Sequence, residues 1–289
     1  MNILFIVNPI SGKKKKNNID EILHGILDNT SINFEIKYTE YAGHANKLAS
    51  ENVGKYNTII AAGGDGTVNE VARALILKDT VFGIIPLGSG NGLARSLKIP
   101  VNTVKAVENI VNGNVKKIDS GIVNEKPFIN ISGIGFDAEV AHLFNKSKTR
   151  GFKTYFNVVA KKFSSYKPHE CIIRIKGQDD IITKPFLVSF ANSSQWGNNA
   201  YISPISNQED GLLEICILEK FPIAITPFLV GRLFLKNIHN SPFMNIFQTD
   251  ACELQFKNKV KGHIDGEPVQ FDNTLKIKIL KHSINIITP

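Results

Sequence analysis

The stretch Thr58–Glu70, TIIAAGGDGTVNE, decides the fold. It begins as an apolar run of strand type, breaks at a pair of glycines and continues with residues spaced as in a helix. Asp65 and Thr67 occupy the break. A glycine-rich turn between a buried strand and a helix lets backbone N–H groups converge on an anion. We therefore interpret this stretch as part of a phosphoryl-transfer site.

The rest of the first half repeats the alternation of strand and helix. Apolar runs of strand type at residues 3–7, 34–38 and 81–87 are each followed by a loop and a segment of helical spacing. This alternation is typical of an α/β domain with a doubly wound parallel sheet. We predict such a nucleotide-binding domain over residues 1–121.

The second half has a different pattern. Short strand-type runs separated by turn residues predict a mainly β sandwich over residues 122–282. Within it, residues 136–166 have helical spacing and are predicted to form a helical insertion. The tail, residues 283–289, is too short to assign from its pattern, and one interpretation is that it returns to the first domain.

Composition limits the class of protein. The 289 residues include 34 Lys and Arg and 26 Asp and Glu, so the net charge is +8, which suits an anionic partner. The three cysteines have no CxxC spacing, which favours a reduced, cytoplasmic protein. The apolar stretch Phe221–Leu235 is interrupted by prolines and an arginine and is too short for a membrane span. Any membrane contact is therefore expected to be peripheral, at the inner face.

Two further loops follow predicted strands of the first domain, Asn8–Gly12 and Gly88–Gly92. Parallel strands end at one edge of a sheet, and ligands bind there. Three glycine-containing loops at one edge favour an anion site, whereas a single one could be an ordinary turn. Asp65 could face a metal ion beside a phosphate, accept a proton, or only cap the following helix. For Glu70, one turn later, a functional role and a helix-dipole role are equally good interpretations.

These motifs resemble the diacylglycerol-kinase catalytic domain family, which includes bacterial lipid kinases, sphingosine kinases and ceramide kinases. The matching stretches are NPISG at 8–12, YTEYAGHA at 38–45, GGDGTVNE at 63–70, PLGSGNGLAR at 86–95, FINISGIGFDAEV at 128–140, ANSSQWGNNAYISPISNQEDGLLEI at 191–215 and HIDGEP at 263–268. The resemblance extends over nearly the whole chain. It implies an ATP- and Mg²⁺-dependent kinase that transfers the γ-phosphate to a hydroxyl of diacylglycerol or a related lipid at the membrane surface.

The resemblance also implies site residues. The ATP contacts would be Asn8, Pro9, Ser11, Gly12, Thr39, Gly63, Gly64, Asp65, Gly66, Thr67, Asn69, Ser89 and Asn91. The catalytic carboxylates would be Asp65, near the metal and phosphates, and Asp265 or Glu267, one of which takes the proton of the lipid hydroxyl. Without the resemblance, the segment Asp265–Glu267 would be interpreted as a hairpin turn. A structural Mg²⁺ site would use Asn207, Asp210 and Leu212, and an Asp-Gly turn is an equally good interpretation there.

The lipid and the reaction class have alternatives. Gly92 stands where diacylglycerol-type members usually carry Asp, and a small residue is closer to the sphingosine- and ceramide-kinase pattern. A kinase of a small diffusible substrate resembling NAD kinase would also have a GGDGT loop. A non-catalytic lipid- or nucleotide-binding regulator is a third class, and the presence of Asp65, Asp265 and Glu267 argues against it.

Two groups of cations are candidate membrane contacts. Lys13–Lys16 follows the first loop, and Lys146–Lys162 lies in the predicted insertion with aromatic residues interleaved. Basic groups beside aromatic side chains suit an anionic lipid surface, and a solvated charged face is the alternative. No nucleic-acid-binding module is recognisable, so nucleic acid is not an expected partner. The sequence leaves the oligomeric state open, with a homodimer as one option.

Overall fold

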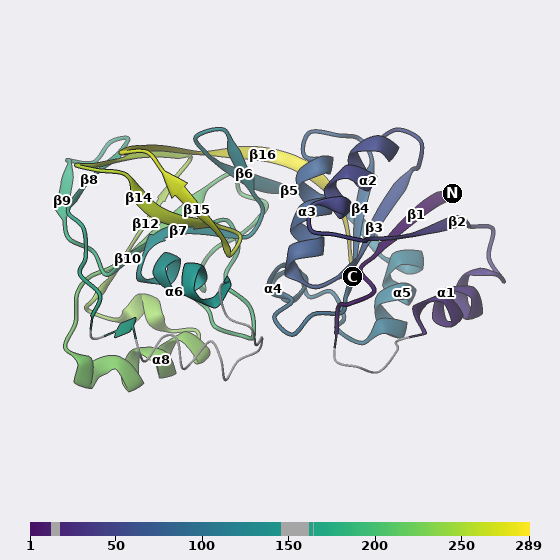
Figure 1. Ribbon diagram of the computed structural model, residues 1–289, viewed down its shortest axis with the longest axis horizontal. Helices are drawn as coiled ribbons and strands as arrows, with labels where there is room; N and C mark the ends of the chain where they lie inside the picture. The colour runs from purple at the N-terminus through teal and green to yellow at the C-terminus, as the bar shows by residue number, and fades with distance from the viewer. Residues whose placement is uncertain (13–17, 146–161, 164) are drawn as a thin grey trace. The chain divides into compact units, whose positions relative to one another are not determined.

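The computed structural model describes residues 1–12, 18–145, 162–163 and 165–289 (Figure 1). They form two compact units: unit 1 comprises Met1–Asp119 and Lys281–Pro289, and unit 2 comprises Ser120–Leu280. Unit 1 is an α/β domain with a parallel sheet, and unit 2 is mainly β, so the predicted fold class is confirmed. Most of the predicted insertion lies outside the described residues.

Parallel strands form the sheet of unit 1. In spatial order they are β2 (Asn33–Tyr38), β1 (Asn2–Val7), β3 (Thr58–Gly63), β4 (Val81–Pro86) and the end of β16 (Thr274–Thr288). Every residue of β3 is buried, and only the first residue of β1 is exposed. A sheet that is covered on both faces requires such continuous apolar strands.

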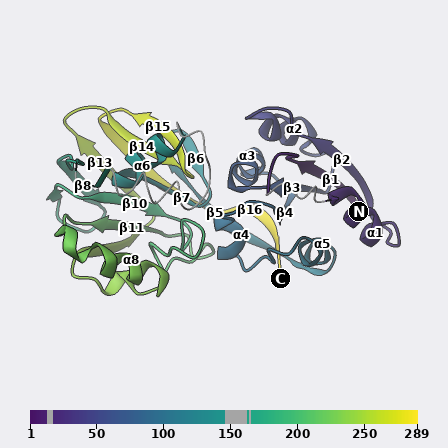
Figure 2. The same cartoon turned by 60° about the horizontal axis from the view of Figure 1, so that its bottom comes forward.

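Helices cover both faces of this sheet. α1 (Ile19–Leu27) and α5 (Thr103–Asn112) share one apolar core with the strands. α2 (His44–Asn52) and α3 (Asp65–Leu75) lie together on the opposite face (Figure 2). The short helix α4 (Gly92–Ser96) follows β4. The loops that lead from strands into helices therefore gather at one edge of the sheet, which is the arrangement of a doubly wound fold.

Unit 2 is built from two antiparallel sheets. One contains, in order, β12 (Met244–Thr249), β11 (Leu213–Leu218), β10 (Leu187–Ala191), β7 (Ile131–Gly135), β14 (Val260–Ile264) and β15 (Glu267–Phe271). The other is the part of a ten-stranded sheet that continues through β16 from the strands of unit 1: it contains the first part of β16, β13 (Ala251–Phe256), β8 (Cys171–Ile175), β9 (Ile181–Thr183), β6 (Lys126–Phe128) and the end of β5 (Asn114–Val123). Residues of β11 alternate between faces, so that Ile215 and Ile217 enter the core between the sheets and Cys216 and Leu218 face outward.

Two helices cover the outer face of the first of these sheets. α6 (Phe136–Asn145) and α8 (Thr226–Phe234) contribute Phe136 and Leu229 to one apolar cluster with Leu218 of β11. The 3₁₀ turns η1 (Ile223–Ile225) and η2 (Ile238–Asn240) flank α8. Sequence spacing does not predict β12 or α8, and the structure adds both. Within the described part of the chain, no helix combines the length and the apolar character that a membrane crossing needs.

Candidate functional site

Two loops at the carboxyl ends of β1 and β3 are joined by hydrogen bonds. Asn8 Nδ2 donates to Thr67 Oγ1 at 3.0 Å, and Gly64 N donates to Ser11 Oγ at 3.2 Å. Asn8 Oδ1 also accepts from Ile10 N at 3.1 Å, which shapes its own loop. The structure therefore brings these predicted nucleotide contacts into one place.

Asp65 joins the loop after β3 to the loop after β4. Its Oδ2 accepts from Asn91 N at 2.9 Å, and its Oδ1 accepts from Gly92 N at 2.7 Å. Burial raises the pKa of the Asp65 carboxyl, and these N–H donors and the Arg95 guanidinium oppose that rise. Asp65 is thus a structural link between two loops, in addition to being the acid that the sequence singles out.

Two glycines permit this close approach of the loops. A Cβ atom at Gly88 would lie 2.7 Å from Gly64 Cα, and one at Gly90 would lie 2.6 Å from Asp65 Oδ2. Carbon atoms do not approach other atoms so closely, so these positions require glycine. At Gly66, in contrast, a Cβ atom would meet nothing within 4 Å. Gly66 lies in the first turn of α3, so the open space beside it is next to backbone N–H groups that can bind an anion.

The remaining predicted nucleotide contacts belong to the same loops and to α3. Thr39 follows β2, and its N–H donates to Val7 O at 2.9 Å. Asn91 has a φ of 50° and donates from Nδ2 to Gly88 O at 2.8 Å, so it holds the turn before α4. The buried members of the set are Gly63, Thr67, Asn69 and Asn91, and the exposed ones are Pro9, Gly12, Gly66 and Ser89.

Glu70 has a structural role in this geometry. Its carboxylate accepts from Gly43 N at 2.8 Å and from Ala45 N at 3.0 Å, at the start of α2. A carboxylate that accepts from the first N–H groups of a helix stabilises that helix. Glu70 therefore fixes the loop that contains Thr39. The sequence suggests that Glu70 interacts with the dipole of its own helix, α3, and the structure shows that it caps the neighbouring helix α2.

The predicted carboxylates of unit 2 lie at the turn between β14 and β15. Asp265 and Gly266 have φ values of 50° and 82°, the signs that a two-residue type I′ hairpin requires. The Asp265 carboxylate accepts from Ile129 N at 3.1 Å and from Asn130 N at 2.8 Å. Glu267, the first residue of β15, is exposed. The hairpin interpretation is correct, and the catalytic role of the two carboxylates stays a prediction.

A buried pair that sequence reasoning does not single out supports this turn. Gly266 N donates to His263 Nδ1 at 3.2 Å, so the proton of the imidazole is on Nε2, which donates to Asp137 Oδ2 at 3.1 Å. Ser189 Oγ also donates to Asp137 Oδ2, at 3.3 Å. The signal in the sequence is that His263 lies two positions before Asp265 and that both members of the pair fall in matching stretches, 263–268 and 128–140.

The predicted metal ligands Asn207, Asp210 and Leu212 lie in the loop before β11. Asp210 Oδ1 accepts from Leu212 N at 2.9 Å, and Asn207 Oδ1 accepts from Glu209 N at 3.2 Å. These contacts are those of turns. An exposed carboxylate beside main-chain carbonyls is nevertheless a set of hard oxygen donors that suits Mg²⁺. No three acidic, His or Cys side chains of the described residues are placed to hold a metal, so the Mg²⁺ site depends on main-chain oxygens and stays a prediction.

Most of the predicted membrane lysines cannot be placed. Lys13–Lys16 and residues 146–161 lie outside the described residues. Lys162, the last of its cluster, lies 3.4 Å from Glu139 Oε2, and Lys261 lies 2.9 Å from Glu139 Oε1. Lys162 is therefore engaged in an ion pair on α6.

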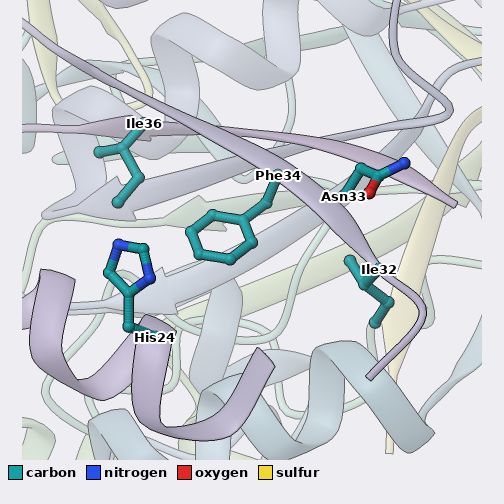
Figure 3. Close-up of a pocket in the computed structure, with 5 residues that line it drawn as sticks. All are labelled: His24, Ile32, Asn33, Phe34 and Ile36. Atoms are coloured by element: carbon teal, nitrogen blue, oxygen red, sulfur yellow. The ribbon is translucent and has the colours of Figure 1, made fainter. Parts of the chain in front are cut away.

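A hollow of about 480 Å³ lies between α1 and β2 (Figure 3). It is lined by His24, Ile32, Asn33, Phe34 and Ile36. The ring of His24 lies 5.1 Å from that of Phe34, and its Nδ1 lies 3.0 Å from Asp28 Oδ1. None of the predicted site residues lines this hollow, so we assign no part of the candidate site to it.

Each half of the chain matches a known protein family. Residues 2–123 match the diacylglycerol kinase catalytic domain, and residues 130–288 match the YegS C-terminal NAD kinase beta sandwich-like domain. A diacylglycerol kinase of Bacillus subtilis strain 168 is 32% identical over 274 residues, which cover 91% of this chain and 88% of the relative. A protein of Escherichia fergusonii named "Probable lipid kinase YegS" is 30% identical over 276 residues, with 91% and 89% covered.

Solved structures agree with this fold. A diacylglycerol kinase structure from Bacillus anthracis str. Sterne covers all of this chain, with 97% of its own chain aligned, a TM-score of 0.76 and 20% identity. Another crystal structure from the same organism gives a TM-score of 0.82 at 23% identity, with the same shares covered. At these identities the likeness shows the fold alone.

Proposed function

The chain belongs to the diacylglycerol kinase catalytic domain family, and from this premise we propose that it is an ATP- and Mg²⁺-dependent lipid kinase. It transfers the γ-phosphate to a hydroxyl of diacylglycerol or a related lipid at the membrane surface. The observation that carries the proposal is the position of Asp65, whose two oxygens join two glycine loops beside the open first turn of α3. Backbone N–H groups for phosphates and a carboxylate for a metal thus occur together.

Unit 1 binds the nucleotide phosphates in this proposal. Gly64 and Gly66 present the backbone of the loop after β3, and Asn8 and Thr67 keep the neighbouring loop in position. Asp65 would hold Mg²⁺ beside the phosphates, and the Asn207–Leu212 turn would hold a structural Mg²⁺. Bound at the phosphates, Mg²⁺ neutralises the charge that develops during transfer.

Unit 2 supplies the base. The Asp265 carboxylate is engaged with the backbone N–H groups of Ile129 and Asn130, which orients the turn. Glu267 is exposed at the start of β15 and can approach an acceptor hydroxyl. We assign Glu267 as the general base and Asp265 as the residue that positions it.

The lipid class is a matter for assay. Gly92 N donates to Asp65 Oδ1 at 2.7 Å, so an aspartate at position 92 would add a second carboxylate near the first. Glycine at this position leaves Asp65 without an adjacent carboxylate there. The difference bears on the metal and phosphate environment, and it does not identify the acceptor.

A screen with labelled ATP and Mg²⁺ tests the proposal. The acceptors are diacylglycerol, monoacylglycerol, phosphatidylglycerol, a sphingoid base, ceramide, undecaprenol and NAD, each with the wild-type chain and with Asp65→Asn. We expect Asp65-dependent transfer to one lipid class. Transfer to NAD and to no lipid would make the protein an NAD kinase-like enzyme. ATP binding by calorimetry without turnover on any acceptor would make it a regulator.

A further inference from the structure

Helix α8 is apolar on its outward side as well as on its inward side. Leu229 is buried in the cluster with Leu218, and Ile225 and Leu233, one turn away on either side, pack against the same cluster. A surface helix normally presents polar residues on the side opposite such a stripe. Here Phe228 and Phe234, on the two flanks of the buried stripe, are both exposed.

Large apolar side chains on α8 and just beyond its two ends are exposed, and we call this group the α8 face. Its members, with the exposed fraction of each, are Ile223 (64%), Phe228 (58%), Val230 (38%), Phe234 (41%) and Leu235 (73%). Figures 1 and 2 show α8 at the outer margin of unit 2, beyond β10 and β11. Several large exposed apolar side chains gathered at one helix favour a surface that binds a partner or a membrane.

The charged residues of the segment that contains α8 have one sign. Residues 220–249 include Lys220, Arg232 and Lys236, and none of these thirty residues is Asp or Glu. The Arg232 guanidinium lies 4.6 Å from the centre of the Phe228 ring, and Lys236 Nζ lies 4.5 Å from the centre of the Tyr201 ring. The Phe228 ring is exposed and the Tyr201 ring is half-buried. Cations beside aromatic rings are a feature of helices that bind an anionic lipid surface.

We propose that the α8 face docks onto the surface of an anionic phospholipid bilayer. The apolar side chains enter the boundary between headgroups and acyl chains, and the exposed Lys220 and Lys236 contact lipid phosphates. A second copy of this chain is a poorer occupant, because two copies related by a twofold axis would bring like charges together. The proposal rests on the proposed action at a membrane surface, and it uses a surface distinct from the lysine clusters singled out in the sequence.

Vesicle sedimentation tests the docking directly, without any assay of transfer. The full chain is mixed with phosphatidylcholine vesicles and with vesicles that also contain phosphatidylglycerol. We expect the wild type to bind the anionic vesicles. The double substitution Phe228→Ser and Leu235→Ser should lower the partition coefficient by about tenfold or more, because it removes two large apolar side chains from the contact. Lys220→Glu with Lys236→Glu should lower binding to anionic vesicles only.

Matched controls come from the same unit. Ile182 on β9 is 70% exposed and lies outside the α8 face, so Ile182→Ser should bind vesicles as the wild type does. Lys257→Glu is the control for charge. A Phe228→Ser, Leu235→Ser variant that stays folded and binds as well as the wild type overturns the proposal. If the same variant binds vesicles as the wild type does but loses a dimer that the wild type forms in sedimentation velocity, the α8 face binds a second copy, and the proposal is also overturned.

Assays of lipid phosphorylation test the docking proposal and the kinase proposal independently of each other. On a dispersed short-chain diacylglycerol, the Phe228→Ser, Leu235→Ser variant should turn over as fast as the wild type, and on anionic vesicles it should be slower. If the wild type phosphorylates no lipid but binds vesicles through the α8 face, the kinase proposal fails and the docking stands.

Discussion

The Nε2 atom of His263 lies 3.1 Å from the Oδ2 atom of Asp137, and the same imidazole accepts a hydrogen bond from Gly266 N. The pair therefore connects the first turn of α6 to the turn that presents Asp265. Asp137 and His263 are both buried, so removal of one partner leaves the other without its hydrogen bond at a cost of about 1–3 kcal/mol.

His263→Ala should lower kcat by about 100-fold, because a small displacement of catalytic groups has effects of that size. The KM for ATP should not change, since His263 belongs to unit 2. His263→Gln retains a donor toward Asp137 and should recover part of the rate, whereas a merely structural role would give equal rates for all folded variants. Steady-state kinetics and thermal unfolding of each variant provide the check.

Asp65→Asn should reduce transfer by about 100- to 1000-fold, the effect of removing an oriented electrostatic group. Because an amide replaces one of the two accepting oxygens, we also expect a loss of about 1–3 kcal/mol in unfolding free energy. Kinetics and denaturant unfolding measure the two effects. Activity like that of the wild type would remove Asp65 from the mechanism.

Glu267→Gln should lower kcat by about 100- to 10,000-fold while ATP binding is kept, as expected for a general base. Glu267 is exposed, so its substitution should change stability by no more than about 0.5 kcal/mol. Asp265→Asn should lower both kcat and stability, because its carboxylate accepts from Ile129 N and Asn130 N. If Glu267→Gln remains active and Asp265→Asn does not, the two assignments are reversed.

Gly90→Ala should weaken ATP binding, because its Cβ atom would lie 2.6 Å from Asp65 Oδ2 and would separate the two loops. Gly25→Ala is the control: the site in α1 has nothing within 4 Å, and alanine should stabilise that helix by about 0.5–1 kcal/mol. Calorimetry measures the ATP affinity of both variants. If Gly90→Ala binds ATP as tightly as the wild type does, close contact between the loops after β3 and β4 is not needed for binding.

Glu214 makes stability depend on pH. Burial raises the pKa of its carboxyl above the ordinary 4.5, and the hydrogen bond that Gln248 Nε2 donates to Glu214 Oε1 opposes the rise. The folded protein therefore binds this proton more tightly than the unfolded chain does. The resulting stabilisation is full below pH 4.5 and is lost as the pH rises through the folded-state pKa. Unfolding free energies at several pH values should show Glu214→Gln gaining relative to the wild type with rising pH, and parallel profiles would contradict this.

The strand, turn and helix of Thr58–Leu75 could be predicted because each has a local signal: an apolar run, a glycine pair and helical spacing. The partners of Asp65 could not. Its oxygens bond to residues 26 and 27 positions farther along the chain, and local spacing contains no information on such contacts. The same holds for His263 and Asp137, which are 126 positions apart.

Two elements, α8 and β16, also could not be predicted, because neither has one regular hydrophobic pattern along its length. α8 has apolar residues that are exposed, such as Phe228 and Phe234, as well as the buried Leu229, so its apolar residues do not mark a single face. β16 alternates between buried and exposed residues up to Ile279 and is almost wholly buried from Ser283 onward. β16 begins in an antiparallel sheet with one solvated face and ends in a parallel sheet that is covered on both faces. Because its hydrophobic pattern changes from alternating to continuous, the sequence does not reveal one continuous strand.

The continuity of β16 has a consequence for biosynthesis. Ile286 pairs with Phe82 in the sheet of unit 1, yet it follows the whole of unit 2 in the chain. On the ribosome, the strand that completes the first unit does not exist until the second unit has been made. Nascent unit 1 therefore leaves the edge of β4 open during elongation, and an unpaired edge is a site of misassociation. The kinase would be most dependent on chaperones in that interval.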